Sequence, residues 1–231
     1  GIGIADVNHK KGQETARHFT SQYGNNKAVF LQCDVTSDQQ LEDAFKKTKQ
    51  KFGQLDIVCN NAGIGDERKW RQMIDINLAA VVQGTYLARK YLSKLNGGSG
   101  GVVINIASMA GLILGPLCPV YTATKHGVVG FTRTMASFDP AFTAEDIRIN
   151  TICPSFSDTS IIHKTVPPEF INSSTVRRLS DIAKLLPVSL VAEGFISLIE
   201  EDAHDKVMRV THERGIDFHK FKKTPPMPSK M

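Results

Sequence analysis

The sequence predicts an α/β fold in which a single domain is built on a doubly wound parallel sheet. Short β-branched runs alternate with longer helical patterns, which is the signature of βαβ units. The run at residues 102–106 is almost continuously apolar, as in the centre of a sheet that helices cover on both faces. A chain of 231 residues with 41% hydrophobic content is long enough to bury one sizeable core.

The strands are predicted where β-branched and apolar residues dominate a short run: residues 2–6, 28–33, 55–59, 102–107, 147–153 and 207–211. The helices are predicted where apolar residues recur at helical spacing: residues 10–22, 37–52, 69–95, 120–138 and 189–200. In the second helix, Leu41, Ala44 and Phe45 share a face, and Ser37 suits the N-cap. Ligands of such sheets bind beyond the carboxyl ends of the strands, so the residues that follow each strand are the functional candidates.

Composition argues against several classes of protein. The net charge of +5 comes from scattered Lys and Arg, so no basic stripe indicates a nucleic-acid partner. The apolar stretch at residues 101–117 is interrupted by polar residues and glycines and is too short to span a membrane. No secretion signal opens the chain, and we expect a cytoplasmic protein. The four cysteines do not have metal-ligand spacing, so no metal site is expected.

The most specific motif is Tyr121 followed four residues later by Lys125, near the start of a predicted helix. Residues four apart share a helix face, and a lysine ammonium stabilises a phenolate, lowering a tyrosine pKa from about 10. Tyr121 could then act as a general base toward an alcohol. Ser108, at the end of a strong strand, could hold the same substrate oxygen. Taken alone, such a pair more often marks a solvated helix face.

Two further features strengthen this interpretation. The turn Asn60, Asn61, Ala62 and Gly63 directly follows a strand, where small residues let a flat ligand approach the backbone. Asn77 is an amide in an otherwise apolar helix. Helix capping or core hydrogen bonding is the alternative explanation for Asn77.

In order and spacing, Asn60 to Gly63, Asn77, Ser108, Tyr121 and Lys125 resemble the signature of the short-chain dehydrogenases, and the resemblance covers the whole chain. It implies a Rossmann-type domain and a catalytic tetrad. In that tetrad Tyr121 is the base and Ser108 orients the substrate. Lys125 grips the cofactor ribose and lowers the tyrosine pKa, while Asn77 supports a proton-relay water.

The resemblance also implies a nicotinamide cofactor. Asp6 ends the first strand, where its carboxylate could bind both adenosine-ribose hydroxyls and would repel a 2′-phosphate, which favours NAD over NADP. An acidic strand end facing solvent is the alternative. Asp34 and Val35 resemble adenine contacts, and Ser157 begins the stretch that resembles the carboxamide contact. The full predicted cofactor set is Asp6, Val7, Cys33, Asp34, Val35, Asn61, Ala62, Gly63, Tyr121, Lys125, Ser157, Asp158 and Thr159.

Within the family, the segments 30–35, 96–101, 125–133 and 215–218 resemble a subfamily that oxidises hydroxylated lipids such as prostaglandins. This resemblance implies a lipid secondary alcohol that is converted to a ketone, with substrate contacts at Ser108, Cys118 and Tyr121. Cys118 stands where the subfamily has a glutamine that contacts substrate, so the exact substrate stays open. The family commonly forms homodimers through helices corresponding to residues 69–95 and 120–138.

The chain departs from the family pattern at its start. Gly1-Ile2-Gly3 is not a phosphate-binding turn, because such a turn stands about twenty residues before the ribose-binding acid and Asp6 follows Gly3 by three. We interpret residues 1–6 as the family's second strand. The domain is then expected at residues 1–218 without its first βα unit, or with an internal deletion, and a basic, proline-containing tail at 219–231. We expect this chain to be inactive and poorly stable, and the intact gene product to be an active dehydrogenase.

Two alternatives to the lipid dehydrogenase remain. A non-catalytic relative that binds a partner or serves a structural role is favoured by the absent glycine turn, by Cys118, and by Ser155 where the family usually has glycine. The retained tetrad opposes it, because folding does not need those residues. A carbonyl, steroid or retinoid reductase is the alternative among enzymes.

Overall fold

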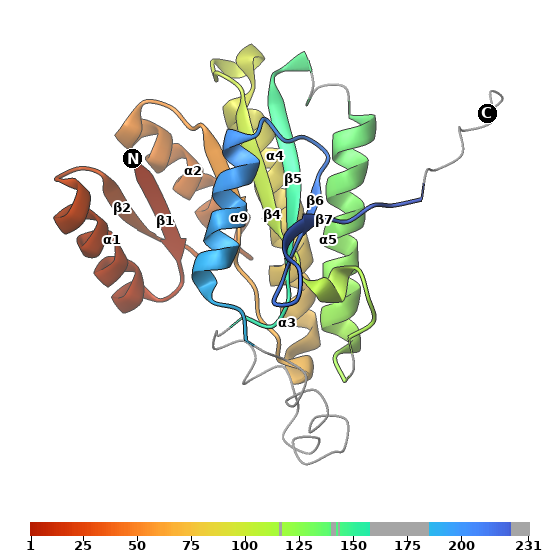
Figure 1. The fold of residues 1–231 in the computed structure, drawn as a ribbon. Coiled ribbons are helices and arrows are strands. Elements are labelled where there is room, and N and C mark those ends of the chain that lie inside the picture. Colours follow the sequence, from red (N-terminus) through yellow and green to blue (C-terminus); the bar gives the residue numbers. More distant parts are fainter. Residues whose placement is uncertain (116, 140–141, 143, 158–184, 223–231) are drawn as a thin grey trace.

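A computed structural model describes residues 1–115, 117–139, 142, 144–157 and 185–222. It is a parallel α/β fold with helices on both faces of the sheet (Figure 1). The strands are β1 (Ile2–Asp6), β2 (Ala28–Gln32), β3 (Ile57–Asn60), β4 (Gly101–Ile106), β5 (Ile147–Pro154), β6 (Val207–Thr211) and β7 (Gly215–Phe218). The helices are α1 (His9–Tyr23), α2 (Asp38–Phe52), α3 (Trp70–Ile74), α4 (Ala80–Leu92), α5 (Pro119–Phe138) and α9 (Val188–Glu200).

All six predicted strands form, with ends that differ by at most two residues from the prediction. Sequence periodicity missed β7, which turns back from β6 through Gly215 and pairs antiparallel with it. Gly215 has a φ of 66°, a left-handed conformation that glycine adopts without strain. An ion pair between Arg209 and Asp217 joins the two strands of this hairpin, and Arg209 Nε lies 2.7 Å from Asp217 Oδ1.

The helix predicted at residues 69–95 is not one regular helix. After the short 3₁₀ turn η1 (Glu67–Lys69) and α3, the chain makes a π-helical turn, η2 (Asp75–Ala79), before α4 begins. Asn77 sits inside this turn, and its side chain bonds to the backbone of Ile64 rather than facing solvent. Single π turns in α-helices often occur at functional sites. The helix α4 ends at Leu92. The short turn η3 (Lys94–Asn96) follows, and Gly97 after it takes a left-handed conformation.

The core is divided between the two faces of the sheet. On one face α2, α4 and α5 pack through a cluster that includes Phe45, Leu92 and Val103. On the other face α9 packs against β4, β5 and β6 through Ile104, Leu198 and Met208. Val103 and Ile104 are adjacent in β4 and point to opposite faces, as the period of a strand requires. This is the doubly wound arrangement that the sequence predicts.

α1 covers the face of β2 opposite to α2. Gly12 allows this close approach, because a Cβ there would lie 2.1 Å from the Phe30 ring. Leu31, the next residue of β2, packs on the other side against the α2 cluster. Asn8 caps the start of α1 by accepting the Lys11 amide, and Ser37 caps α2 as predicted.

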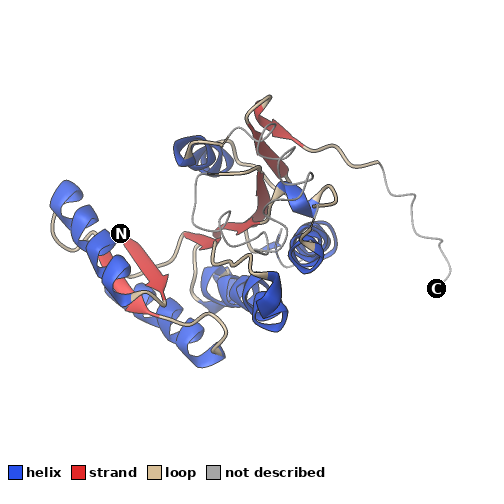
Figure 2. Cartoon of the chain, turned by 90° about the horizontal axis from the view of Figure 1, so that it is seen from below, coloured by secondary structure: helices blue, strands red, loops and turns tan. Residues whose placement is uncertain are grey.

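The sheet is interrupted between β1 and β3. Among the described residues β1 pairs only with β2, and β3 pairs only with β4, so the sheet runs as β1–β2 and as β3–β4–β5–β6–β7 (Figure 2). Apolar side chains at the interruption are open to solvent, with Ile2 41% and Ile57 43% exposed. Gly3 lies within β1 and Gly1 directly precedes it, so this segment leads into a strand, as interpreted, and does not form a phosphate-binding turn.

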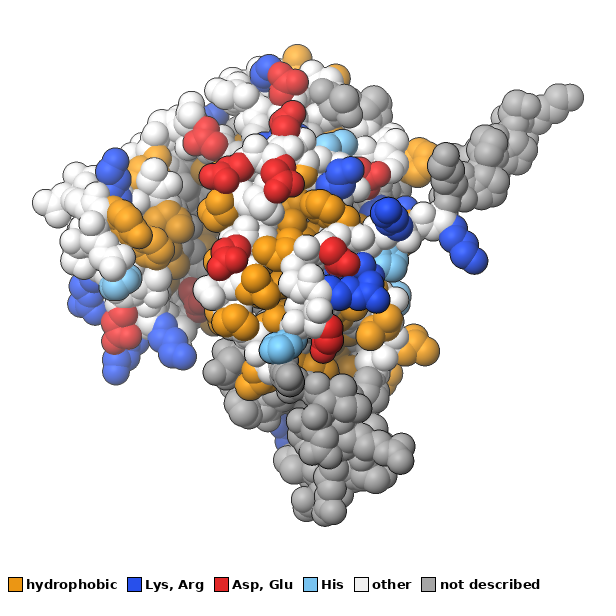
Figure 3. Space-filling model, viewed as in Figure 1, with side chains coloured by type: hydrophobic (Ala, Val, Ile, Leu, Met, Phe, Trp, Pro, Cys, Tyr) orange, Lys and Arg blue, Asp and Glu red, His pale blue; other side chains and the backbone are white. Residues whose placement is uncertain are grey.

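The face that carries α9 and β7 shows apolar side chains among carboxylates (Figure 3). Val188, Ile196 and Phe218 are exposed there. No helix in the described part of the chain is both long and apolar enough to cross a bilayer.

Candidate active site

Ser108 and Tyr121 are brought together beyond the carboxyl end of β4. Ser108 lies two residues after that strand, and Tyr121 lies in the first turn of α5. The Ser108 hydroxyl and the Tyr121 phenol lie close enough to interact. Burial raises the pKa of Tyr121 above its ordinary value, and the Ser108 hydroxyl opposes that shift. The net shift is upward, opposite to the lowering that was predicted from the neighbouring Lys125, because burial outweighs the groups that favour the phenolate. A phenol and a hydroxyl so placed can share one substrate oxygen.

Lys125 is buried beneath the tyrosine, not on a solvated helix face. It is 4% exposed, and its Nζ donates to the carbonyl oxygen of Ile106 at 2.9 Å. The same Nζ lies 5.7 Å from the centroid of the Tyr121 ring. Burial lowers the pKa of Lys125 to about 8, a shift that the nearby Cys153 thiol partly opposes. A lysine with this pKa can exchange a proton near neutral pH.

Asn77 holds the loop that follows β3. Its Oδ1 accepts the Ile64 amide and its Nδ2 donates to the Ile64 carbonyl oxygen, both at 2.8 Å. Nδ2 also lies 3.4 Å from Thr124 Oγ1 in α5. A Cβ on Gly63 would be 3.4 Å from Asn77 Oδ1 and 3.8 Å from Lys125 Nζ. Asn77, the Gly63 turn and Lys125 therefore meet in one place, and core hydrogen bonding, the alternative noted from the sequence, is part of what Asn77 does.

A buried polar network behind the site was not predicted from the sequence. Asn60 Nδ2 donates to Asn105 Oδ1 at 2.8 Å, and Asn105 Nδ2 donates to Thr132 Oγ1 at 2.9 Å. Thr85 joins both amides from α4. The network links β3, β4, α4 and α5, so it fixes the helix that carries Tyr121 against the sheet. The only sequence signal for it was Asn105, a polar residue inside an apolar strand.

Glu67 was also missed. Its carboxylate accepts the backbone amides of Val120 and Tyr121, at 3.2 and 2.9 Å, in the first turn of α5. Nothing in its local sequence indicates this role, because the partner amides come 53 and 54 residues later.

Cys118, a predicted substrate contact, is buried directly before α5. Its Sγ lies 3.7 Å from Thr122 Oγ1, and the Thr122 hydroxyl also accepts the Gly115 amide. Burial raises the pKa of the Cys118 thiol, so the neutral thiol is favoured at neutral pH. Cys118 stands three residues before Tyr121 in the sequence, and its Sγ contacts the Thr122 hydroxyl in this structure.

The predicted adenosine contacts gather where β1 and β2 end. The Cys33 amide donates to the Asp6 carbonyl oxygen at 3.1 Å, which places Val7, Asp34 and Val35 beside that point. Asp6 is exposed and its Oδ1 accepts the Asn8 amide at 2.7 Å. In the described residues nothing bonds to its Oδ2. The structure is therefore compatible with both explanations of Asp6, a ribose contact and a solvated strand end.

The remaining predicted cofactor residues follow other strands. Asn61 and Ala62 are exposed at the end of β3, and Ser157 follows β5 and forms an isolated bridge with Leu186. Asp158 and Thr159 lie outside the described residues. Among the residues that the structure describes, no group of three or more His, Cys, Asp or Glu side chains could hold a metal ion.

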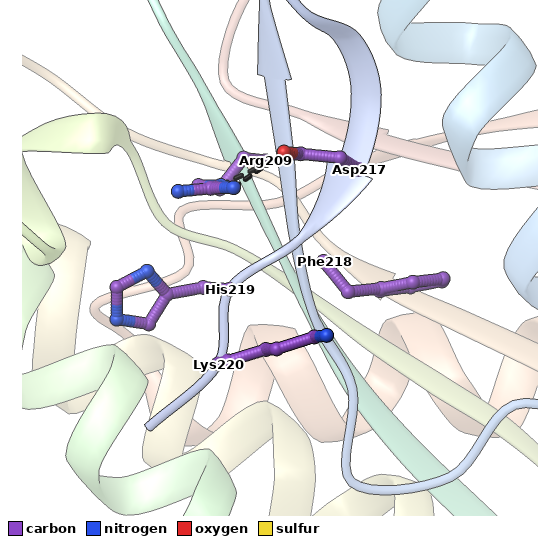
Figure 4. Close-up of a pocket in the computed structure, with 5 residues that line it drawn as sticks. All are labelled: Arg209, Asp217, Phe218, His219 and Lys220. Carbon is purple, nitrogen blue, oxygen red and sulfur yellow. Dashed lines mark hydrogen bonds and ion pairs between the residues drawn. The ribbon is translucent and has the colours of Figure 1, made fainter. Parts of the chain in front are cut away.

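A separate shallow recess lies on the β6–β7 hairpin, lined by Arg209, Asp217, Phe218, His219 and Lys220 (Figure 4). None of these residues belongs to the predicted site. The segment after β7 stays bound to the domain, because the His219 amide donates to the Val207 carbonyl oxygen of β6. Phe221 packs under the Arg133 guanidinium, 3.5 Å from its ring centroid.

A doubly wound parallel sheet with a tyrosine, a serine and a buried lysine beyond its carboxyl edge defines an α/β oxidoreductase. A model of the short chain dehydrogenase family matches residues 2–169, and the chain belongs to that family. The human protein 15-hydroxyprostaglandin dehydrogenase (NAD⁺) is 39% identical over 230 residues, which cover 97% of this chain and 86% of the human one. This similarity confirms the predicted resemblance within the family.

Other relatives agree at the level of family and fold. A 3β-hydroxysteroid dehydrogenase of Eggerthella lenta is 34% identical over 166 residues, covering 68% of this chain and 61% of the bacterial one. Among solved structures, 7α-hydroxysteroid dehydrogenase with NADH and 7-oxo glycochenodeoxycholic acid has a TM-score of 0.77 at 23% identity, covering 91% and 83% of the two chains. ElxO with NADP bound has a TM-score of 0.73 at 27% identity, covering 90% and 86%.

Proposed function

We propose that this protein oxidises a secondary alcohol of a hydroxylated lipid, such as a prostaglandin, to a ketone with NAD. The observation that carries the proposal is the juxtaposition of the Ser108 hydroxyl and the Tyr121 phenol above the buried Lys125. The identity to 15-hydroxyprostaglandin dehydrogenase over nearly the whole chain supports the substrate class. NAD, when bound, accepts the hydride of the carbinol carbon.

The residues of the site fit proton transfer at a single oxygen. Ser108 donates to the substrate oxygen and holds it beside the Tyr121 phenol. Tyr121 takes the hydroxyl proton as the carbinol carbon loses its hydride. Lys125, with a pKa near 8, stabilises the phenolate and can pass a proton onward. Asn77 keeps the Gly63 turn close to the Lys125 ammonium.

The choice of NAD rests on Asp6. Its exposed carboxylate at the end of β1 has one oxygen bound to the Asn8 amide and a second that faces no described partner. Such a carboxylate can accept from ribose hydroxyls, and its charge disfavours a 2′-phosphate. Val7, Cys33, Asp34 and Val35 are the proposed surroundings of the adenosine, and Asn61, Ala62, Gly63 and Ser157 those of the nicotinamide half.

We also propose that the sheet accepts one more parallel strand between β1 and β3. The two facing edges are unpaired among the described residues, and Ile2 and Ile57 expose apolar surface beside them. The first βα unit of the family fits this place, and its glycine-rich turn would supply amides for the cofactor's pyrophosphate. A chain preceded by that unit of human 15-hydroxyprostaglandin dehydrogenase, called here the extended version, provides the material for kinetic tests.

The test measures NADH absorbance with prostaglandins that carry a secondary alcohol, with steroid alcohols and with small secondary alcohols. We expect the extended version to oxidise the hydroxylated lipid with NAD in preference to NADP, and the 231-residue chain to bind NAD more weakly. A preference for steroid alcohols would move the substrate class to the hydroxysteroid dehydrogenases. No turnover with any alcohol and no NAD binding in either version would contradict the proposal and favour a non-catalytic relative.

A further inference from the structure

The helix that carries Tyr121 has no cap of its own. Cys118 occupies its N-cap position and makes no capping hydrogen bond, and Pro119 stands at the first helical position without an N–H. The first backbone N–H groups of α5 that need an acceptor from outside the helix are therefore those of Val120 and Tyr121. Most helices satisfy such amides with a Ser, Thr, Asp or Asn side chain at the N-cap, and an uncapped first turn frays.

Glu67 takes the place of the missing cap. Its Oε2 accepts the Val120 amide at 3.2 Å and its Oε1 accepts the Tyr121 amide at 2.9 Å. Both carboxylate oxygens are used, one for each amide. Glu67 is half-buried, and a carboxylate at a helix N-terminus is favoured by the helix dipole as well as by the hydrogen bonds.

The segment that carries Glu67 is itself anchored a few residues earlier. Asn77 binds both backbone groups of Ile64, and Asp66 accepts the Arg68 amide in the turn that presents Glu67. The chain between Gly63 and η1 is thus fixed at one end by Asn77 and attached at the other to α5. The backbone of Tyr121 is held from the turn after β3, and the tyrosine side chain reaches Ser108 from that fixed backbone.

We propose that Glu67 is a positioning residue that caps α5 from a distance and keeps the Tyr121 hydroxyl at the Ser108 hydroxyl. Its consequence for turnover rests on the proposed function, whereas its effect on the helix does not. The assignment predicts that the contributions of the two Glu67 oxygens can be measured separately, because each accepts a different amide. Glu67→Ala removes both acceptors, and Glu67→Gln keeps one acceptor while turning an NH₂ toward the other amide.

Amide hydrogen exchange of the 231-residue protein tests the cap. In Glu67→Ala we expect the Val120 and Tyr121 amides to exchange about five- to tenfold faster, in line with the loss of a helix cap. In Glu67→Gln the acceleration should fall mainly on one of the two amides. Glu42→Ala removes a carboxylate that pairs with Lys90 on the surface and is the matched control, with unchanged exchange at both amides.

The resonance of the Tyr121 ζ-carbon tests the positioning. Ser108→Ala removes the hydroxyl partner of Tyr121 and defines the direction of the shift. Glu67→Ala should move this resonance in the same direction, Glu67→Gln by less, and Glu42→Ala not at all. In the extended version, Glu67→Ala should lower kcat by about tenfold or more with a small change in the KM for NAD.

Unchanged exchange at Val120 and Tyr121 in Glu67→Ala, or faster exchange without movement of the Tyr121 resonance, would overturn the assignment. If the extended version oxidises no alcohol, the proposed function fails, and the exchange and resonance measurements still decide the role of Glu67. If turnover is normal and Glu67→Ala leaves kcat unchanged, the positioning role fails alone.

Discussion

The Lys125 ammonium lies under the ring of Tyr121, 5.7 Å from its centroid, and donates to the Ile106 carbonyl oxygen at 2.9 Å. Lys125 and Glu145 are buried charged residues of the described chain, and Lys125 is the one that lies beside the candidate catalytic tyrosine. This position places a cation where a phenolate would form, and it also makes the charge costly to bury. Function and stability therefore oppose each other at Lys125, and the opposition can be measured.

Lys125→Met is predicted to stabilise the fold most below pH 8. Burial lowers the pKa of Lys125 from 10.5 to about 8, so between these values the unfolded chain binds the proton more readily and the lysine's stability penalty falls as pH rises. The penalty is about 3 kcal/mol at pH 7 and disappears above pH 10.5. Urea unfolding of both proteins at pH 7 and pH 10 should show the gain from Met shrinking. An equal difference at both pH values would contradict the buried, shifted lysine.

Asn77→Asp is predicted to destabilise the protein by about 1–3 kcal/mol, because a carboxylate cannot donate to the Ile64 carbonyl oxygen and leaves it unpaired. Asn96→Asp is the matched control, since Asn96 is exposed and its amide donates to a surface carbonyl. Chemical unfolding gives the free energies of both variants. A loss for Asn96→Asp as large as that for Asn77→Asp would argue against the clamp on Ile64.

Asp6→Ser is predicted to reduce the preference for NAD over NADP. The exposed carboxylate at the end of β1 is the group proposed to repel the 2′-phosphate, and serine keeps a hydrogen-bonding oxygen without the charge. Fluorescence titration of the extended version with both cofactors measures the ratio of dissociation constants, which should fall about tenfold or more. Glu200→Gln makes the same charge change at the end of α9. A ratio that moves equally in both variants would point to net charge and not to Asp6.

Homodimer formation through α4 and α5 is predicted from exposed aromatic side chains on these helices. Tyr86 and Phe131 make an edge-to-face ring contact across the two helices, with Tyr86 49% exposed, and Phe138 is 65% exposed. Tyr86→Glu should convert a dimer to a monomer in light scattering, and Tyr23→Glu on α1 should leave the mass unchanged. A monomeric parent protein, or a dimer unaffected by Tyr86→Glu, would exclude this interface.

The sequence predicted the elements that depend on local pattern. The apolar runs at residues 102–107 and 147–153 are strands β4 and β5, and Ser37 caps α2, because burial on both faces and a side-chain cap leave a signal within a few residues. Tyr121, Ser108 and Lys125 were found by spacing and are brought together in the structure. Ser108 follows β4, and Tyr121 and Lys125 lie one turn apart in α5, so local spacing was enough to find them.

What sequence reasoning missed depends on contacts between distant segments. Glu67 finds its partners 53 and 54 residues later, and Asn60 finds Asn105 across 45 residues. The π turn contains Asn77, whose side chain is bonded to a loop 13 residues earlier, a contact that its own helical pattern does not indicate. The local sequence pattern indicates a helix-surface position for Lys125. It is buried because α5 packs against the sheet at this point.

The most direct test of the proposed chemistry compares Tyr121→Phe with Tyr91→Phe in the extended version. Tyr91 is a partly buried tyrosine of α4 whose ring lies 5.7 Å from that of Phe45, away from Ser108, so its hydroxyl takes no part in the proposed reaction. The measurement is NADH formation from a hydroxylated lipid, with circular dichroism to verify folding. We predict that Tyr121→Phe loses about a thousandfold or more in kcat with the fold intact, and that Tyr91→Phe stays near the parent rate. A Tyr121→Phe variant that retains the parent rate would contradict the account.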